Sequence, residues 1–409
     1  MKLHTIAIYG LLLAALLVGI EACVSHGEPF GEELTTKDLL VRLAHPDEGH
    51  QWSKNSQFEI EFIERNTSIR KKVTTKEEYT TVALPMGYYS VNIQAHEADE
   101  NGTHYFYRGY SPTLIVDKNS CDSLRIMMNR ANEKPSPLVI AEIFPTGTLT
   151  PDGKQFDEDK YLVLYNQSAD TLYLDGICIS TSPFLQNLKI KPIPDIAYKA
   201  TAADAILQIP GSGKEYPLPP HHHTLISDNA NNHLEGNPLS WDATISDFEF
   251  FWPGEHDDID NPEVPNLLIQ YSFIVMNNQA SQTFFVWKLP KGLTMQQYLN
   301  DYKYYFYWMF IQGDITVKME ENEYCVPNEW ILDAVNLCPT QEFEWISTSP
   351  TVDCSYTYCT DIGLSNNRYR NAVIRKKSQL DTLIYQDSNN SAEDFIPQIE
   401  ASQLRSTRK

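Results

Sequence analysis

Short stretches in which apolar and polar residues alternate set the strongest limit on how this chain can fold. In the segment QFEIEFIER, Phe58, Ile60 and Phe62 fall on one side of an extended strand and polar residues fall on the other. A second stretch alternates in the same way from Tyr89 to Ile93, after a Pro-x-Gly turn. A period of two residues is typical of β-strands with one buried face, so the sequence predicts an all-β fold.

A polar linker at residues 131–137, which contains two prolines, separates two regions that are rich in such strands. The predicted organisation is two β-sandwich domains in tandem, a small one over residues 38–131 and an enlarged one over residues 137–402. Within the second, a long segment at about 253–327 is predicted to be an insertion between core strands. Loops on a rigid scaffold often carry function, so individual properties are expected there.

The first 22 residues have the pattern of a secretory signal peptide. An unbroken apolar run covers residues 6–20. That run is shorter than the roughly 20 apolar residues that span a bilayer comfortably, and it fits the apolar core of a signal peptide. No second apolar run of membrane length follows.

The residues behind this run indicate attachment to lipid. Ala22 precedes Cys23, and the order resembles a bacterial lipobox, in which the cysteine becomes the first mature residue and is acylated. Glu21 departs from the pattern, because a small or apolar residue is usual there. The resemblance implies a lipid anchor on Cys23 followed by a tether over residues 23–37. Ordinary cleavage with a free thiol, or an uncleaved anchor, are the alternatives.

The first predicted sandwich carries a recognisable motif. The Leu-Pro-x-Gly-x-Tyr pattern at residues 84–89 resembles the transthyretin-like or carboxypeptidase-regulatory-like β-sandwich. In such modules the sandwich usually acts as a spacer or a docking unit, so the resemblance implies no chemistry here.

The second region resembles the lamin-tail type of immunoglobulin-like sandwich. Its opening strand contains Glu142, and Tyr165, Asn166 and the Leu-Asp-Gly at 174–176 follow the core of that family. The end of the region, at residues 381–395, resembles the closing strand and tail of the family. The chain departs from the pattern at the three histidines of 221–223, which replace a glycine turn, and at Ser388, which stands in place of a threonine.

A signal peptide, a small sandwich and an enlarged lamin-tail-like sandwich, in that order, resemble an uncharacterised lipoprotein family of Bacteroides and its relatives. The resemblance implies an outer-membrane lipoprotein, displayed on the cell surface or, alternatively, facing the periplasm. It implies no known reaction.

Composition narrows the range of partners and of covalent features. Fifty-four acidic residues against 32 basic ones give a formal charge of −22, which would repel a nucleic acid backbone. Four late cysteines stand at Cys325, Cys338, Cys354 and Cys359. An exported chain permits disulfides, so at least one bridge among these four is expected rather than a zinc site, although the sequence does not fix the pairing.

Three other features are candidates for function. Asp257, Asp258 and Asp260 lie in a proline-bounded acidic loop and are candidate calcium ligands, because hard cations take several oxygen ligands from such loops; a solvated acidic loop is the alternative. Calcium is therefore the only cofactor that the sequence suggests.

Ser123, Thr171 and Thr382 each follow an aspartate and precede an apolar residue, which resembles the O-glycosylation signal of Bacteroidota.

The third feature is the aromatic segment DYKYYFYWMF at residues 301–310. In a strand, Tyr302, Tyr304, Phe306 and Trp308 would share one face, where they are candidate ligand-binding residues. A strand buried on both faces would give the same composition.

Neither a nucleophile elbow nor a metalloprotease helix occurs in the sequence. We therefore expect a non-enzymatic, lipid-anchored envelope protein that binds a ligand or docks on a partner, such as an outer-membrane nutrient transporter. A structural or assembly component of an outer-membrane complex is the first alternative. A glycan-directed hydrolase with a pair of carboxylates is the second.

Overall fold

The computed structural model describes residues 35–45, 49–67, 69–98, 102–131, 136–253, 258–312, 315–378 and 381–406. The predicted signal peptide, the predicted lipidation site Cys23 and nearly all of the predicted tether lie outside these ranges. Strands dominate the described residues, so the predicted all-β fold is confirmed. No helix in the described ranges is both long enough and apolar enough to cross a membrane.

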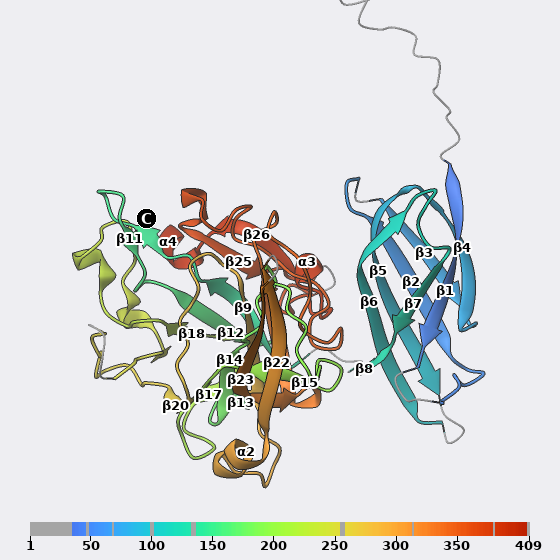
Figure 1. Cartoon of the computed structure of the whole chain (residues 1–409). Helices are drawn as coiled ribbons and strands as arrows, with labels where there is room; N and C mark the ends of the chain where they lie inside the picture. Colours follow the sequence, from blue (N-terminus) through green and yellow to red (C-terminus); the bar gives the residue numbers. More distant parts are fainter. Residues whose placement is uncertain are drawn as a thin grey trace, which may run out of the picture.

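The strands near the amino terminus form two sheets that face each other (Figure 1, blue and teal). One sheet has the order β4-β1-β7 and the other has the order β3-β2-β5-β6-β8. Their bounds are β1 (Thr36–Ala44), β2 (Gln57–Glu64), β3 (Arg70–Thr75), β4 (Tyr79–Pro85), β5 (Gly87–Ala98), β6 (His104–Val116), β7 (Ser123–Met127) and β8 (Asn129–Ala131). We call residues 36–131 the first module.

Burial in the first module follows the alternation in its sequence. Phe58, Ile60 and Phe62 are fully buried, whereas Glu59 and Gln57 of the same strand are exposed. The buried side chains of both sheets form one hydrophobic cluster between the layers. The predicted strand faces are therefore confirmed in this part of the chain.

The remaining strands build a larger body, which we call the second module. A six-stranded sheet has the order β19-β18-β12-β9-β25-β26, and a five-stranded sheet has the order β20-β16-β14-β21-β24. The six strands are β9 (Leu138–Phe144), β12 (Tyr161–Asn166), β18 (His223–Ser227), β19 (Phe248–Glu249), β25 (Asn371–Arg375) and β26 (Phe395–Glu400). The five strands are β14 (Ile177–Thr181), β16 (Ala205–Gln208), β20 (Leu268–Tyr271), β21 (Gln282–Lys288) and β24 (Ile331–Leu337).

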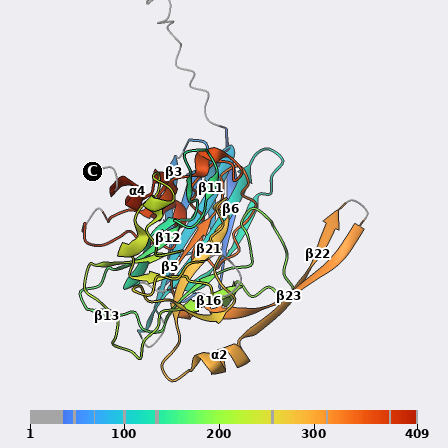
Figure 2. The ribbon, with the colours of Figure 1, turned by 90° about the vertical axis from the view of Figure 1, so that its left-hand side faces the viewer.

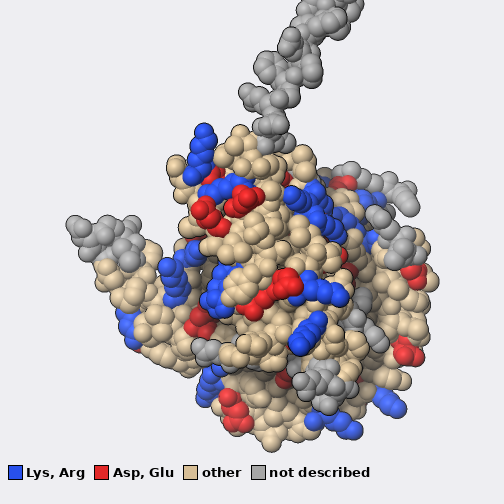
Figure 3. Space-filling view, turned by 90° about the vertical axis from the view of Figure 1, so that its right-hand side faces the viewer, with Lys and Arg blue, Asp and Glu red and all other residues tan. Residues whose placement is uncertain are grey.

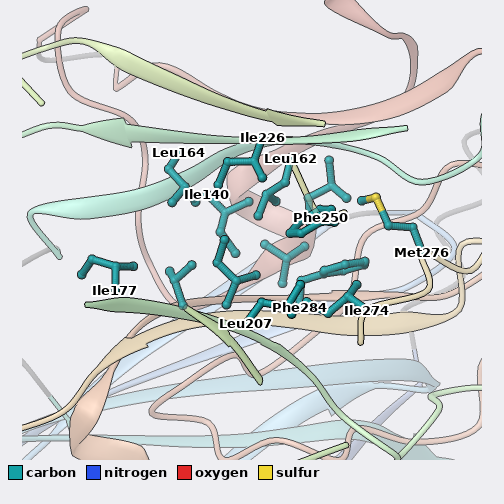
Figure 4. Packing of buried hydrophobic residues seen from close by; sticks show 14 of the residues in the cluster. Ile140, Leu162, Leu164, Ile177, Leu207, Ile226, Phe250, Ile274, Met276 and Phe284 are labelled. Atoms are coloured by element: carbon teal, nitrogen blue, oxygen red, sulfur yellow. The ribbon is translucent and has the colours of Figure 1, made fainter. Parts of the chain in front are cut away.

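Apolar side chains of these two sheets meet in the main core of the second module (Figure 4). Ile140, Leu162 and Ile226 come from the six-stranded sheet, and Leu207 and Phe284 come from the five-stranded sheet. Because these strands cross the whole body, they are buried along their full length, as in β9 and β12.

The segment at 253–327, which was predicted to be an insertion between core strands, itself contains the core strand β21. This strand lies inside the five-stranded sheet, between β14 and β24, and the side chains of residues 282–287 are all buried. This segment therefore contributes a core strand, because its Phe-Phe-Val-Trp run packs on both faces. Only the part that follows Lys288 leaves the body.

Smaller elements complete the second module. They comprise β10 (Thr148–Leu149), β11 (Gln155–Phe156), β13 (Leu172–Tyr173), β15 (Ala200–Ala203), β17 (Pro217–Leu218), β22 (Lys303–Gln312), β23 (Ile315–Pro327), α2 (Met295–Asp301), α3 (Ser391–Asp394), α4 (Ser402–Ser406) and four 3-10 turns, η1 (His233–Glu235), η2 (Ala243–Ile245), η3 (Asn328–Trp330) and η4 (Asn366–Arg368). Thr294 and Gln297 form a capping box at the start of the helix α2.

Candidate functional site

A long hairpin projects from the second module (Figure 2). Its strands β22 and β23 pair in register from Lys303 opposite Tyr324 to Gln312 opposite Ile315. At its base, β15 pairs with β23 at residues 324–327, which completes a small three-stranded sheet. We call the hairpin the β22–β23 arm.

One face of the arm packs onto the body near its base. Phe306 is fully buried and its ring lies 5.0 Å from that of Phe184. Tyr304 is also buried, and its hydroxyl donates a hydrogen bond of 2.7 Å to the carbonyl oxygen of Pro194. These contacts fix the direction in which the arm leaves the body.

This packing corrects the expectation that Tyr302, Tyr304, Phe306 and Trp308 form an open binding face. Tyr304 and Phe306 are core residues, and Trp308 packs partly against the same cluster. The ring of Tyr302 lies 4.9 Å from that of Trp330, in a second cluster at the base of the arm. The four residues therefore support the arm rather than face a ligand.

The exposed apolar residues of the arm lie elsewhere. Phe310, Val317 and Met319 lie on one face of the outer arm, and Tyr305 and Met309 lie on the opposite face; the exposed fractions of all five are between 41% and 50%. Phe310 stands opposite Val317 in the register, and Trp308 stands opposite Met319. An isolated hairpin is at best marginally stable in water, and grouped exposed apolar side chains commonly mark a protein interface.

Only part of this outer surface could be found in the sequence. The predicted aromatic strand includes Phe310, but Val317 and Met319 come from β23, which no motif singled out. Their alternation in ITVKMEE was the available signal. Below the tip, Lys318 and Tyr305 both contact the carboxylate of Glu320, so the surface becomes charged towards the base.

The acidic loop is described only in part. Asp257 lies outside the described residues. Asp258 accepts hydrogen bonds from the backbone N–H of Trp252 at 2.8 Å and from the amide of Asn229 at 2.9 Å. Asp260 accepts one of 2.9 Å from the amide of Asn266. Within the described ranges, neither carboxylate belongs to a cluster of three possible metal ligands. The contacts of Asp258 and Asp260 favour a hydrogen-bonded loop over a calcium site.

Glu249 lies close to this loop, and its carboxyl group interacts with that of Asp260. Its side chain is fully buried and accepts hydrogen bonds from the backbone N–H groups of Ala230 and Asn261. Burial, together with the nearby carboxylate of Asp260, raises the pKa of Glu249 to about 7.

A neighbouring depression of about 320 Å³ has an aromatic wall. The rings of Trp252 and Phe273 stack there with centroids 3.3 Å apart. Lys160 and Asp228 lie on the same surface, and burial raises the pKa of Asp228 to about 7. The amino group of Lys160 is already held by the carbonyl oxygen of Met276 at 2.9 Å, so it is a structural cation.

The two modules meet across a second depression, of about 190 Å³. Arg70 of the first module forms a 2.6 Å ion pair with Glu393 of the second. Arg108 and Asn92 face Cys354 in the same space. Figure 1 shows that β5 and β6 form the edge of the first module that lies nearest to the second.

The surface of the first module carries charges of both signs rather than a uniform patch (Figure 3). Lys72 pairs with Glu59 at 3.1 Å, and Arg42 pairs with Glu78 at 3.4 Å.

The remaining expectations concern surface positions and thiols. Ser123, Thr171 and Thr382 are all exposed, so an enzyme could reach each of them.

The expectation of a late disulfide is wrong, because all six cysteines of the described ranges are free thiols. Each of the four late cysteines sits among its own packing partners, and burial raises the pKa of the Cys338 thiol to about 12.

Comparison with known proteins finds a family model and a solved structure that are similar to this chain. Residues 219–402 match the model of a family described as protein of unknown function (DUF4876). A crystal structure of a DUF4876 family protein from Bacteroides thetaiotaomicron VPI-5482 is similar, with a TM-score of 0.54 and 22% identity, covering 91% of this chain and 98% of that chain. The similarity shows a shared fold, and an uncharacterised Bacteroides-type family agrees with the resemblance found in the sequence.

Two other results add no argument. A pilus adhesin, SpaC from Lactobacillus rhamnosus GG, aligns with 57% of this chain at 12% identity, but the TM-score is 0.14. No curated protein matches the chain.

Proposed function

We propose that this chain is an acylated envelope protein that docks on another envelope protein through the β22–β23 arm and performs no chemistry of its own. The observation that carries the proposal is the set of exposed apolar residues Phe310, Val317 and Met319, which share one face of the outer part of the arm. The leader and Cys23 in the sequence support a lipid anchor on the outer membrane, at the cell surface in preference to the periplasmic leaflet.

The composition of the tip favours a protein as the partner. Met309, Phe310 and Met319 belong to residue types that are enriched in the centre of protein interfaces. Methionine side chains adapt to an irregular groove in a protein partner. An apolar groove in a membrane transporter, with basic residues near the position of Glu320, would fit this surface.

The packing at the base of the arm also favours docking. Phe184 and Pro194 fix its base on the rigid body, so the tip is held away from the module rather than folded against it. Docking of a held surface loses less conformational entropy than docking of a loose loop.

The test compares an arm variant with a matched surface variant in the native envelope. The double substitution F310S and V317S removes a facing apolar pair at the tip, and L364S removes a leucine that is still more exposed from another surface of the second module. After gentle solubilisation, the chain should co-purify with one membrane protein in a fixed ratio. The arm variant should lose at least about nine-tenths of that protein, because apolar anchors dominate such interfaces, whereas L364S should retain it.

Thermal unfolding provides the control for folding, since exposed substitutions of this kind usually change stability by about 0.5 kcal/mol or less. Equal co-purification with the arm variant and the unmodified chain, or a chain that purifies alone, would contradict docking through the arm. A partner that disappears from the membrane itself when the arm is altered would point to the assembly role instead.

A further inference from the structure

Three possible metal ligands meet at one end of the first module. His45 directly follows β1, His50 lies in the next loop, and Glu97 lies near the end of β5. One donor atom from each lies within 4.8 Å of the other two. Within the described ranges, no other set of three histidine, cysteine or acidic side chains converges in this way.

The distances in this cluster suit a small cation better than they suit direct hydrogen bonds. The Nε2 atom of His45 lies 3.6 Å from one oxygen of Glu97, and the Nε2 atom of His50 lies 3.6 Å from the other. Hydrogen bonds between nitrogen and oxygen are normally 2.7–3.2 Å long, so both contacts with Glu97 are too long. The same nitrogen of His45 also lies 3.3 Å from the Tyr107 hydroxyl, and a bound ion would replace that contact. In a tetrahedral zinc site with bonds of about 2.0–2.1 Å, neighbouring ligand atoms stand about 3.3 Å apart.

The orientation of the two imidazoles supports the same reading. Their rings stack with centroids 3.9 Å apart and an interplanar angle of 30°. In this arrangement the Nε2 atom of each ring faces an oxygen of the Glu97 carboxylate. Neutral imidazole is also the form of histidine that binds metals.

The surrounding residues hold Glu97 and His45 in place. Glu97 is buried and accepts hydrogen bonds from the backbone N–H of Ser53 at 2.7 Å and from the hydroxyl of Tyr107 at 3.0 Å. The indole of Trp52 packs edge-on against the ring of His45 at 4.7 Å. Such outer partners are characteristic of functional metal sites, because they fix the ligand orientation before the ion arrives.

The site is open on one side. The His50 side chain is 46% exposed, and both histidines line a surface depression of about 780 Å³. Three protein ligands would leave a fourth position for water or for a donor from a bound molecule.

We propose that the first module binds one divalent transition cation of the zinc class through His45, His50 and Glu97. The two nitrogen ligands exclude calcium and magnesium as the preferred ions, since these favour oxygen ligands. The proposal is independent of the arm, which belongs to the second module.

The test uses the full-length chain, purified in mild detergent under reducing conditions and stripped of metal. Calorimetric titration with zinc chloride should show a site of one ion per chain, and zinc should raise the temperature of thermal unfolding. The substitution H50A removes an exposed ligand, so the fold should persist while zinc affinity falls by at least about tenfold. E97Q should also weaken binding, and its folding can be checked by circular dichroism.

Two matched variants separate this site from other histidines. His104 is exposed in the same module, and His222 belongs to the run at 221–223 in the second module. H104A and H222A should bind zinc as tightly as the unmodified chain, and cobalt in place of zinc should give a visible spectrum without thiolate charge-transfer bands. Unchanged binding in H50A, loss of binding in H222A, or a thiolate spectrum would each overturn the proposal.

Discussion

The two modules are built from the same element, the β-strand, but they bury it differently. In the first module the strands alternate between buried and exposed residues, as in β2 and β5, and a single core lies between two sheets. In the second module the central strands β9, β12, β14 and β21 are buried almost throughout. Separate hydrophobic clusters cover the outer faces of both of its sheets.

This difference shows what extra chain length adds to a sandwich. On β21, Phe284 points into the main core, whereas the adjacent Phe285 packs into the cluster on the other side of the sheet. On β2, Phe58 is buried, but the adjacent Glu59 faces solvent. The additional loops and helices of the second module therefore turn an outer sheet face into a second interior.

The largest expected effect tests this comparison directly. F284A and F285A should each destabilise the second module by about 3–5 kcal/mol, because each leaves a cavity in a packed interior. F58A should cost the first module a similar amount, whereas E59A should change its stability by no more than about 0.5 kcal/mol. Trp52 is the single tryptophan of the first module, so its fluorescence reports unfolding there when the other tryptophans are replaced by phenylalanine. A cost below about 1 kcal/mol for F285A would show that the outer cluster is loosely packed.

An intermediate effect concerns the buried glutamates of the two modules. Burial alone would raise the pKa of Glu97 in the first module, but donors such as the backbone N–H of Ser53 and the hydroxyl of Tyr107 lower it overall. In the second module, burial and the proximity of Asp260 raise the pKa of Glu249 from its usual 4.5 to about 7. The folded second module therefore holds a proton that the unfolded chain releases above about pH 4.5.

The sign of the resulting pH dependence follows from that proton. The contribution of Glu249 to stability is greatest below about pH 4.5 and declines as the pH rises to about 7, above which its full cost is present. E249Q should remove this decline and raise stability at pH 8 by on the order of 2–3 kcal/mol. Urea unfolding at several pH values measures it, with E263Q on an exposed residue of the same loop region as the control. Equal pH profiles for E249Q and the unmodified chain would show that Glu249 ionises normally.

The smallest expected effect concerns the boundary between the modules. The ion pair of Arg70 and Glu393 is partly exposed, so a double-mutant cycle with R70A and E393A should give a coupling energy of about 0.2–1 kcal/mol. High salt should reduce that value, because exposed pairs are screened. A coupling energy of zero at low salt would indicate that the two modules fold and unfold without this contact.

The sequence predicted the first module well because its strands have one wet face. The alternation at residues 58–62 identified both the strand and the buried side chains. In the second module, continuous apolar runs such as residues 282–287 do not reveal which face is covered or by what. That is why the segment at 253–327 was interpreted as an insertion although it contains β21.

The candidate sites were harder to predict because they depend on contacts between distant residues. The aromatic pattern located β22 correctly, but it could not show that Tyr304 and Phe306 would pack on Phe184, far away in the sequence. Three strands, β2, β3 and β4, lie between His45 and Glu97 in the sequence, and neither residue belongs to a recognised motif. Single-sequence patterns report periodicity along one strand, whereas a ligand set is defined by the register between strands.

The position of β1 has a mechanical consequence. It is the first strand of the module and also the middle strand of its sheet, where it pairs antiparallel with β4 and parallel with β7. A pull on the chain ahead of Thr36 acts along the axis of β1, so the inter-strand bonds on both of its edges share the load in shear. A strand peeled from a sheet edge would instead lose those bonds one after another. The first module is thereby arranged as a force-bearing link, able to transmit tension to the larger body before it yields.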